Sequence, residues 1–191
     1  MESINWKVRK QLPVIRQTES AECGLACLAM IACWHGLKTD LSTLRERFNI
    51  QGMTLQRLIE CAASIHLSSR AVRLEPEDLR CLNLPSILHW DMNHFVVLHK
   101  VRGNRLYIHD PDRGKITISL LDAGKHFTGV ALELTPASDF TPRNERKKIH
   151  LRQLTGKTPG LLASMTKIII FALALEILAL GGPLLNQLVI D

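Results

Sequence analysis

Cys23 has the residue type and the position that a cysteine nucleophile needs. It begins the run CGLACLAMIACWH, whose small and apolar residues predict a buried helix that starts near 22–23 and stops at Gly36. The free N–H groups and the dipole of a helix N-terminus favour a thiolate there, and a neighbouring imidazole would complete the nucleophile. Cys27 and Cys33 lie deeper in the same helix and lack this advantage. The alternative is that Cys23 only fills the core as a small apolar side chain.

His94 is the histidine that comes with a candidate carboxylate. It begins the apolar run HFVVLHKV and so lies at the start of a predicted strand. If residues 103–105 form a three-residue hairpin loop, Leu98 faces Asp110, and His94 and Asp110 share one face of the hairpin. A two-residue loop would place them on opposite faces. The Asp110-Pro111 pair also fits a simple turn.

Gln17 lies upstream of Cys23 and could assist it. A glutamine amide donates hydrogen bonds, and together with the Cys23 backbone N–H it could hold a developing oxyanion. A metal site built from Cys23, Cys27 and His35 competes with this interpretation, but it lacks a second ligand pair at the spacing typical of zinc sites. The sequence also has no P-loop, serine-hydrolase or zinc-protease motif.

The elements that must position these residues change in type along the chain. After the first helix, Asp40 and Thr54 can cap helices over 41–48 and 55–66. The run 69–74 reads as a strand, and Pro76 opens a short helical turn. Short strand-like runs follow Pro85: PSILHW, HFVVLHKV, RLYIHD, GKITIS and GVALEL. Helices followed by an antiparallel sheet predict an α+β fold.

The composition narrows the class of protein. Of the 191 residues, 46% are hydrophobic and 22% are charged, which excludes a disordered tail, a collagen-like repeat and a disulfide-rich miniprotein. The five cysteines form an odd set without C-x-x-C spacing, and no apolar signal segment precedes them. We therefore expect reduced thiols in a cytoplasmic environment.

The charge is concentrated near the C-terminal end. Residues 1–140 carry a net charge of +2, whereas 141–157 carry +5. From 161 to 180 the only charged residues are Lys167 and Glu176, and about 20 apolar residues suffice to cross a membrane. The preceding basic residues fit a cytoplasmic flank, so we predict a transmembrane helix. A buried amphipathic helix is the alternative.

Several motifs together resemble a known family. These are QTESAECGLAC at 17–27, GMTL at 52–55, PSILHW at 85–90, NHFVVL at 93–98 and DPDRG at 110–114. Their order resembles the peptidase domain of peptidase-containing ABC exporters, which are bacteriocin-processing, papain-like cysteine peptidases. The apolar run ending PLLNQLVID resembles the first transmembrane helix of such an exporter.

The resemblance implies a papain-like peptidase domain at 1–137, a basic linker at 138–160 and a truncated membrane domain at 161–191. By the same resemblance, Cys23 matches the nucleophile, His94 the general base, Asp110 the residue that orients His94, and Gln17 the oxyanion donor. Glu22 stands where an aspartate commonly precedes the cysteine. A degenerate branch of the family lacks the cysteine, and Cys23 argues against that branch.

The implied function is removal of double-glycine-type leader peptides from bacteriocin precursors, coupled to ATP-driven export. The implied location is the inner membrane, with the peptidase domain on the cytoplasmic side and a homodimer in the full-length exporter. We expect no cofactor in the peptidase domain, with ATP and Mg²⁺ bound only by a missing nucleotide-binding domain.

Two other functions remain open from the sequence. The first is a non-catalytic module that docks the substrate before transport. The second is a membrane-anchored basic module that binds anionic lipid or nucleic acid through 143–157. The nearly neutral main domain and its lack of interleaved aromatic residues argue against nucleic acid.

Overall fold

The computed structural model describes residues 11–48, 52–146 and 160–190. Two units divide the chain after Lys147, and the candidate site lies in the first of them. Its helices are α1 (Cys23–His35), α2 (Leu41–Phe48), α3 (Leu55–Ser64) and α4 (Leu120–His126), with short 3-10 helices η1 (Ser20–Glu22) and η2 (Pro76–Cys81). Its strands are β1 (Leu67–Arg73), β2 (Ser86–Trp90), β3 (His94–Arg102), β4 (Arg105–Asp110), β5 (Gly114–Ser119) and β6 (Phe127–Pro136).

The predicted helix boundaries are set by local capping. The Asp40 carboxylate accepts a hydrogen bond from the Thr43 N–H at 2.8 Å, and the Thr54 hydroxyl accepts one from the Arg57 N–H at 3.2 Å. Gly36 ends α1 in the left-handed conformation, with φ of 109°. These caps confirm the three N-terminal helices, although α3 ends two residues earlier than predicted.

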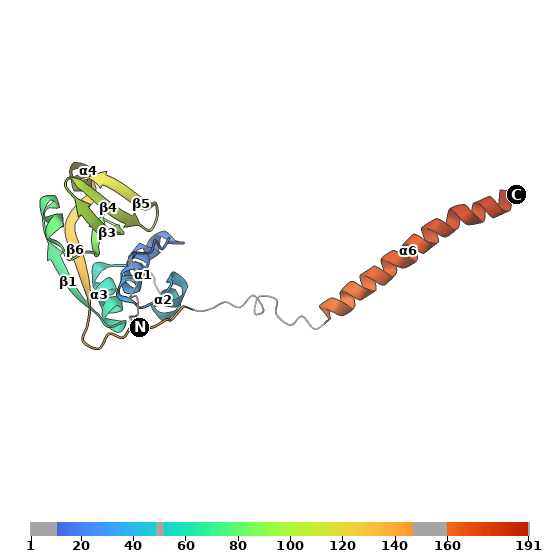
Figure 1. The fold of residues 1–191 in the computed structure, drawn as a ribbon, viewed down its shortest axis with the longest axis horizontal. Coiled ribbons are helices and arrows are strands. Elements are labelled where there is room, and N and C mark those ends of the chain that lie inside the picture. Colours follow the sequence, from blue (N-terminus) through green and yellow to red (C-terminus); the bar gives the residue numbers. More distant parts are fainter. Residues whose placement is uncertain (1–10, 49–51, 147–159, 191) are drawn as a thin grey trace, which may run out of the picture. The chain divides into compact units, whose positions relative to one another are not determined.

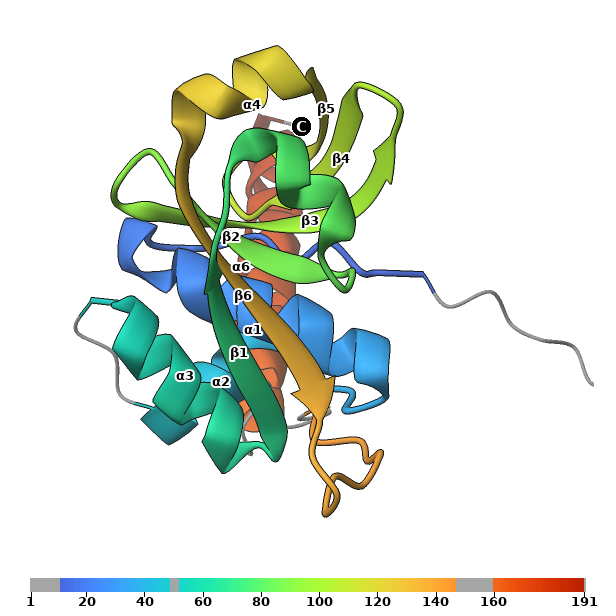
Figure 2. The same ribbon diagram turned by 90° about the vertical axis from the view of Figure 1, so that its left-hand side faces the viewer.

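The strands form one antiparallel sheet in the order β1-β6-β2-β3-β4-β5 (Figure 1). The predicted α+β fold is therefore confirmed. Strand β1, which precedes the other five along the chain, pairs with β6 at one edge of the sheet, and Figure 2 shows the two strands side by side. The sequence analysis missed α4, since LLDAGKH is too short to show a helical period, yet the Ser119 hydroxyl caps it by accepting the Asp122 N–H.

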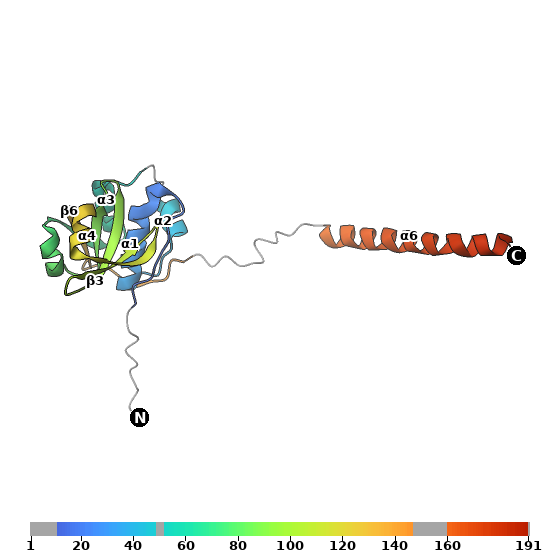
Figure 3. The ribbon, with the colours of Figure 1, turned by 90° about the horizontal axis from the view of Figure 1, so that it is seen from above.

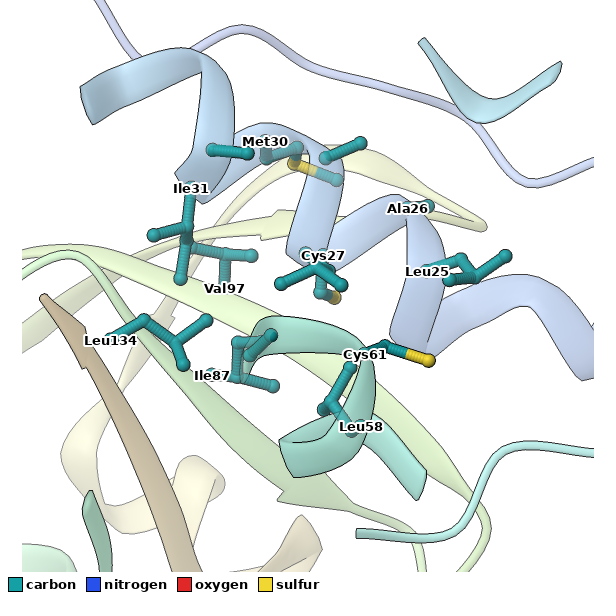
Figure 4. Close-up of a cluster of buried hydrophobic side chains, with 14 of the residues drawn as sticks. Leu25, Ala26, Cys27, Met30, Ile31, Leu58, Cys61, Ile87, Val97 and Leu134 are labelled. Atoms are coloured by element: carbon teal, nitrogen blue, oxygen red, sulfur yellow. The ribbon is translucent and has the colours of Figure 1, made fainter. Parts of the chain in front are cut away.

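Apolar side chains cover both faces of the sheet, because residues alternate between faces along each strand. One face packs on the buried helix α1, which lies against β3 and also contacts α2 and α3 (Figure 3). Figure 4 shows this cluster, in which Cys27, Met30 and Ile31 of α1 meet Ile87 and Val97 of the sheet. The other face carries a second cluster: Leu79, Leu88, Trp90, Val96, Leu98, Leu106, Ile108, Ala123, Phe127 and Ala131.

The segment that follows β6 also packs against the first unit. Lys38 donates its backbone N–H to the Arg143 carbonyl at 2.8 Å, and its own carbonyl accepts the Glu145 N–H at 2.9 Å. Phe140 packs against the α1 cluster. The described part of the predicted linker, 138–146, is thus fixed to the folded unit, and the remaining basic residues, at 147–157, lie outside the described residues.

The second unit contains helix α6 (Leu161–Ile190), whose side chains are described from 163 to 179. Within the part of the chain that the structure describes, no helix is long and apolar enough to cross a membrane. The transmembrane helix predicted at 161–191 includes 161–162 and 180–191, whose side chains lie outside the described residues.

Candidate active site

Cys23 is the first residue of α1, as the sequence predicted. The short helix η1 leads directly into α1, and Cys23 itself is helical with φ of −52° and ψ of −44°. Its side chain is almost completely buried. The thiol is therefore carried by the first helical turn, where the backbone N–H groups have no partner within the helix.

His94 lies at the first position of β3, between Cys23 and Asp110. Its Nε2 is 2.9 Å from Oδ1 of Asp110, and the Cys23 side chain lies close enough to raise the pKa of the ring. Since Nε2 is engaged by the carboxylate, Nδ1 is the nitrogen left for sulfur. The three predicted residues thus form one continuous chain of contacts from thiol to imidazole to carboxylate.

A β-bulge brings His94 and Asp110 to the same face of the hairpin. Of the two loops that the sequence left open, the structure has the shorter one: Arg102 pairs with Arg105, which leaves a two-residue loop at 103–104. The register then shifts between Leu98 and Lys100, so that Leu98 faces Ile108 rather than Asp110. This extra residue on β3 reverses the effect of the shorter loop, so His94 and Asp110 share the face that the three-residue loop alone would have given them.

The charges of the contact chain stabilise one another. The Asp110 carboxylate and the Cys23 side chain raise the pKa of His94 to about 9, outweighing the burial that opposes it. Burial would raise the pKa of Asp110, but hydrogen bonds from His94 and from the Asp112 N–H hold it below its ordinary value. At neutral pH the site therefore holds an imidazolium bonded to a carboxylate, next to the thiol.

Gln17 reaches the same place from the N-terminal segment. Its backbone N–H donates to the Pro111 carbonyl at 3.0 Å, which ties the segment to the turn that follows Asp110. The Gln17 Oε1 atom is buried, with no hydrogen-bond partner among the described residues. The structure therefore brings all four predicted site residues, Gln17, Cys23, His94 and Asp110, into one region.

A pocket of about 240 Å³ opens beside His94. Its lining residues are Gln17, Ser20, Trp90, Asp91, Asn93, His94, Asp110, Asp112 and Arg113. Cys23 does not line it. The pocket is therefore bordered by His94 and Asp110 of the contact chain and by Gln17.

The turn between β2 and β3 forms one wall of this pocket and was not singled out from the sequence. Asp91 and Met92 both have left-handed backbones, with φ of 47° and 65°. His126, on α4, holds the turn: its Nδ1 is 2.6 Å from Asp91 Oδ1, and its ring stacks on Trp90. Two adjacent left-handed residues without glycine leave no signal in the sequence, because the support comes from a distant helix.

The residues of the alternative metal site make other contacts. Cys27 Sγ donates to the Phe95 carbonyl at 3.3 Å, and burial raises the pKa of this thiol well above its ordinary value. His35 Nε2 lies 3.2 Å from the Leu134 carbonyl. Across residues 11–48, 52–146 and 160–190, no cluster of three histidine, cysteine or acidic side chains could hold a metal ion.

Most of the first unit matches the model of one protein family. Residues 11–139 match the model of the Peptidase C39 family, and this range contains all four site residues. The chain belongs to the Peptidase C39 family. The resemblance to peptidase domains of bacteriocin-processing exporters is thereby confirmed, and the C39 match includes both the cysteine-bearing helix and the strands that carry His94 and Asp110.

Two curated relatives of this C39 chain come from Escherichia coli. The colicin V secretion/processing ATP-binding protein CvaB is 43% identical over 190 residues, which cover 98% of this chain and 27% of CvaB. The probable microcin-H47 secretion/processing ATP-binding protein MchF is 40% identical with the same coverage. The chain thus spans about a quarter of the length of these relatives.

Solved structures show the same C39 fold. A double-glycine motif protease from an AMS/PCAT transporter, crystallised with its leader peptide, is 33% identical, with a TM-score of 0.63 over 69% of this chain and 96% of that one. The peptidase domain of Streptococcus ComA, a bifunctional ABC transporter, is 26% identical, with a TM-score of 0.61 over 66% of this chain and 99% of that one.

Proposed function

We propose that this domain is an active cysteine endopeptidase that removes double-glycine-type leaders from peptide precursors. The observation that carries the proposal is the contact chain from Cys23 through His94 to Asp110, with the pKa of His94 raised to about 9. A histidine that stays protonated at neutral pH beside a thiol at a helix N-terminus favours a thiolate–imidazolium pair.

The reaction is covalent acyl transfer. The Cys23 sulfur attacks the scissile carbonyl carbon, and the carbonyl oxygen becomes an oxyanion that the Gln17 amide and the Cys23 backbone N–H stabilise. The C–N bond breaks as His94 gives its proton to the departing amine. Neutral His94 then takes a proton from water, whose oxygen attacks the thioester and releases the leader as a free acid.

The two sides of His94 fit the two halves of the substrate. The acyl half stays bonded to the buried Cys23 sulfur, so the backbone on that side must approach closely, as residues without side chains can do. The amine half leaves toward the pocket beside His94. The solved relative that carries a leader peptide supports a substrate of this class.

Within the full-length protein, we propose that cleavage is coupled to ATP-driven export. The E. coli relatives are secretion/processing ATP-binding proteins, which supports a place at the plasma membrane. We assign the domain to the cytoplasmic side, where leader and precursor are first available, and the full-length exporter to a homodimer. ATP and Mg²⁺ would belong to a nucleotide-binding domain outside this chain.

Incubation with a double-glycine leader peptide, followed by mass spectrometry of the products, tests the proposal. We expect cleavage directly after the second glycine, and its complete loss after thiol alkylation or in Cys23→Ala. The matched control is Cys81→Ala, which changes an exposed cysteine at the end of η2 that does not line the pocket and should cleave normally. Binding of the peptide without thiol-dependent cleavage would overturn the proposal in favour of the docking module.

A further inference from the structure

The carboxylate of Glu22 lies beside the nucleophile but takes no part in the contact chain. Glu22 directly precedes Cys23, and it is only 4% exposed. Its Oε2 accepts hydrogen bonds from the Thr18 N–H and the Glu19 N–H, both at 3.1 Å. A buried carboxylate that accepts hydrogen bonds from backbone N–H groups of its own loop holds that loop in one conformation.

The loop at 18–22, which Glu22 holds, lies between the two proposed oxyanion donors in the sequence. Gln17 ends the segment that hydrogen-bonds Pro111, and Cys23 begins α1. Residues 18–22 connect these two points, so the shape of this loop sets how far the Gln17 amide lies from the Cys23 N–H. An oxyanion site needs both donors at hydrogen-bonding distance from one oxygen atom.

The Glu22 carboxylate is also held by a residue of α2. Arg45 of α2 reaches the Glu22 carboxylate with both Nε and Nη2, and the Nη2 contact to Oε2 is 2.9 Å. Although burial opposes ionisation, the Arg45 hydrogen bonds and the two backbone N–H groups hold the pKa of Glu22 below its ordinary value. A bidentate pair of this kind fixes orientation as well as distance.

We propose that Glu22, held by Arg45, is a positioning residue that sets the spacing of the Gln17 and Cys23 oxyanion donors. This inference rests on the proposed peptidase function and assigns to that site a residue outside its contact chain. Glu22 touches no reacting atom. Its effect on catalysis must therefore pass through the donors, chiefly through Gln17.

A double-mutant cycle on leader-peptide cleavage tests this route. Gln17→Ala should lower kcat by about 10²–10³, as the loss of one oxyanion donor typically does. Glu22→Gln places an amide N–H₂ against groups that are themselves donors, and we expect it to lower kcat about ten-fold with KM nearly unchanged. In the Gln17→Ala background the same change should cost less than about two-fold, because the misplaced donor is already absent.

Two further variants separate positioning from stability. Glu60→Gln removes the acid of an exposed Arg57–Glu60 pair on α3 and should leave kcat unchanged. Arg45→Gln leaves the backbone contacts of Glu22 in place and, because Arg45 is partly exposed, serves as the test variant should Glu22→Gln fail to fold. Its effect on kcat should also vanish in the Gln17→Ala background.

The outcomes distinguish this inference from the proposed function. Strictly additive losses in kcat in both cycles would overturn the positioning role while cleavage by the unchanged protein upholds the peptidase. Lack of cleavage by the unchanged protein would overturn both. A loss confined to the midpoint of thermal unfolding, with kcat intact at a temperature where the variants are folded, would show that Glu22 only stabilises the fold.

Discussion

At the scale of single residues, the site depends on one proton on His94. The carboxylate of Asp110 accepts a hydrogen bond from the imidazole, and the Cys23 thiol contacts the same ring. Both partners favour the charged ring, and only 19% of the side chain is exposed to solvent that could screen them. The protonation state of His94 is therefore the property of the site that pH should change most directly.

We predict that peptidase activity falls on the alkaline side with an apparent pKa of about 9. The reacting form needs imidazolium, and the raised pKa means that this form persists below about 9 and is lost as the pH rises through it. In Asp110→Asn the main cause of the raised pKa is gone, so the alkaline limb should move toward the ordinary histidine value of 6.5. The pH dependence of kcat/KM gives the alkaline limb of the unchanged protein and of Asp110→Asn. An alkaline limb that does not move in Asp110→Asn would contradict the assignment of this pKa to His94.

At the scale of elements, the N-terminus of α1 needs close contact with the segment before α3. A Cβ atom on Gly24 would overlap Cγ of Met53 and would also meet the Phe95 ring at 3.4 Å. Because Cγ lies near the base of the methionine side chain, a rotation of its end cannot clear the space. The glycine next to the nucleophile therefore serves packing rather than backbone freedom.

Gly24→Ala should lower the free energy of unfolding by about 1–3 kcal/mol, the usual cost of an overpacked core. Gly124→Ala is the matched control, since its Cβ would meet Pro76 at an ordinary 3.6 Å and the change replaces a poor helix former in α4. Urea unfolding followed by circular dichroism compares the two. Equal midpoints for both variants would show that the α1–Met53 contact is not tight.

At the scale of the whole molecule, the folded unit includes chain that follows the last strand. Phe140 packs on the α1 cluster, and Arg143 and Glu145 pair with the backbone of Lys38. Arg146 donates from Nε to the Thr39 carbonyl at 3.3 Å. Two of the basic residues assigned to a membrane flank, Arg143 and Arg146, therefore make contacts within the unit.

A chain ending at residue 146 should be more stable than one ending at residue 136, by about 1–3 kcal/mol. The shorter chain exposes the apolar surface that Phe140 covers and removes the partners of the Lys38 backbone groups. Thermal unfolding of the two truncated proteins provides the comparison. A shorter chain with an unchanged Tm would show that 137–146 adds nothing to the fold.

Local signals in the sequence were enough to place the individual site residues. A run of small apolar residues after Glu22 set the start of α1, and a polar cap was enough for α2 and α3, because capping involves residues within one helical turn. An apolar run likewise set the start of β3 at His94. The motifs shared with the family then linked these positions to one chemistry.

The tertiary structure alone decided how the residues meet. The common face of His94 and Asp110 depends on a bulge in β3, and the left-handed turn at Asp91 depends on His126 of α4. The Glu22 carboxylate, which bonds the backbone of the preceding loop, is held by Arg45 of α2. Each is a contact between segments far apart along the chain. Local periodicity and capping do not predict such contacts, because strand register and buried charge pairing are fixed only when the whole core packs.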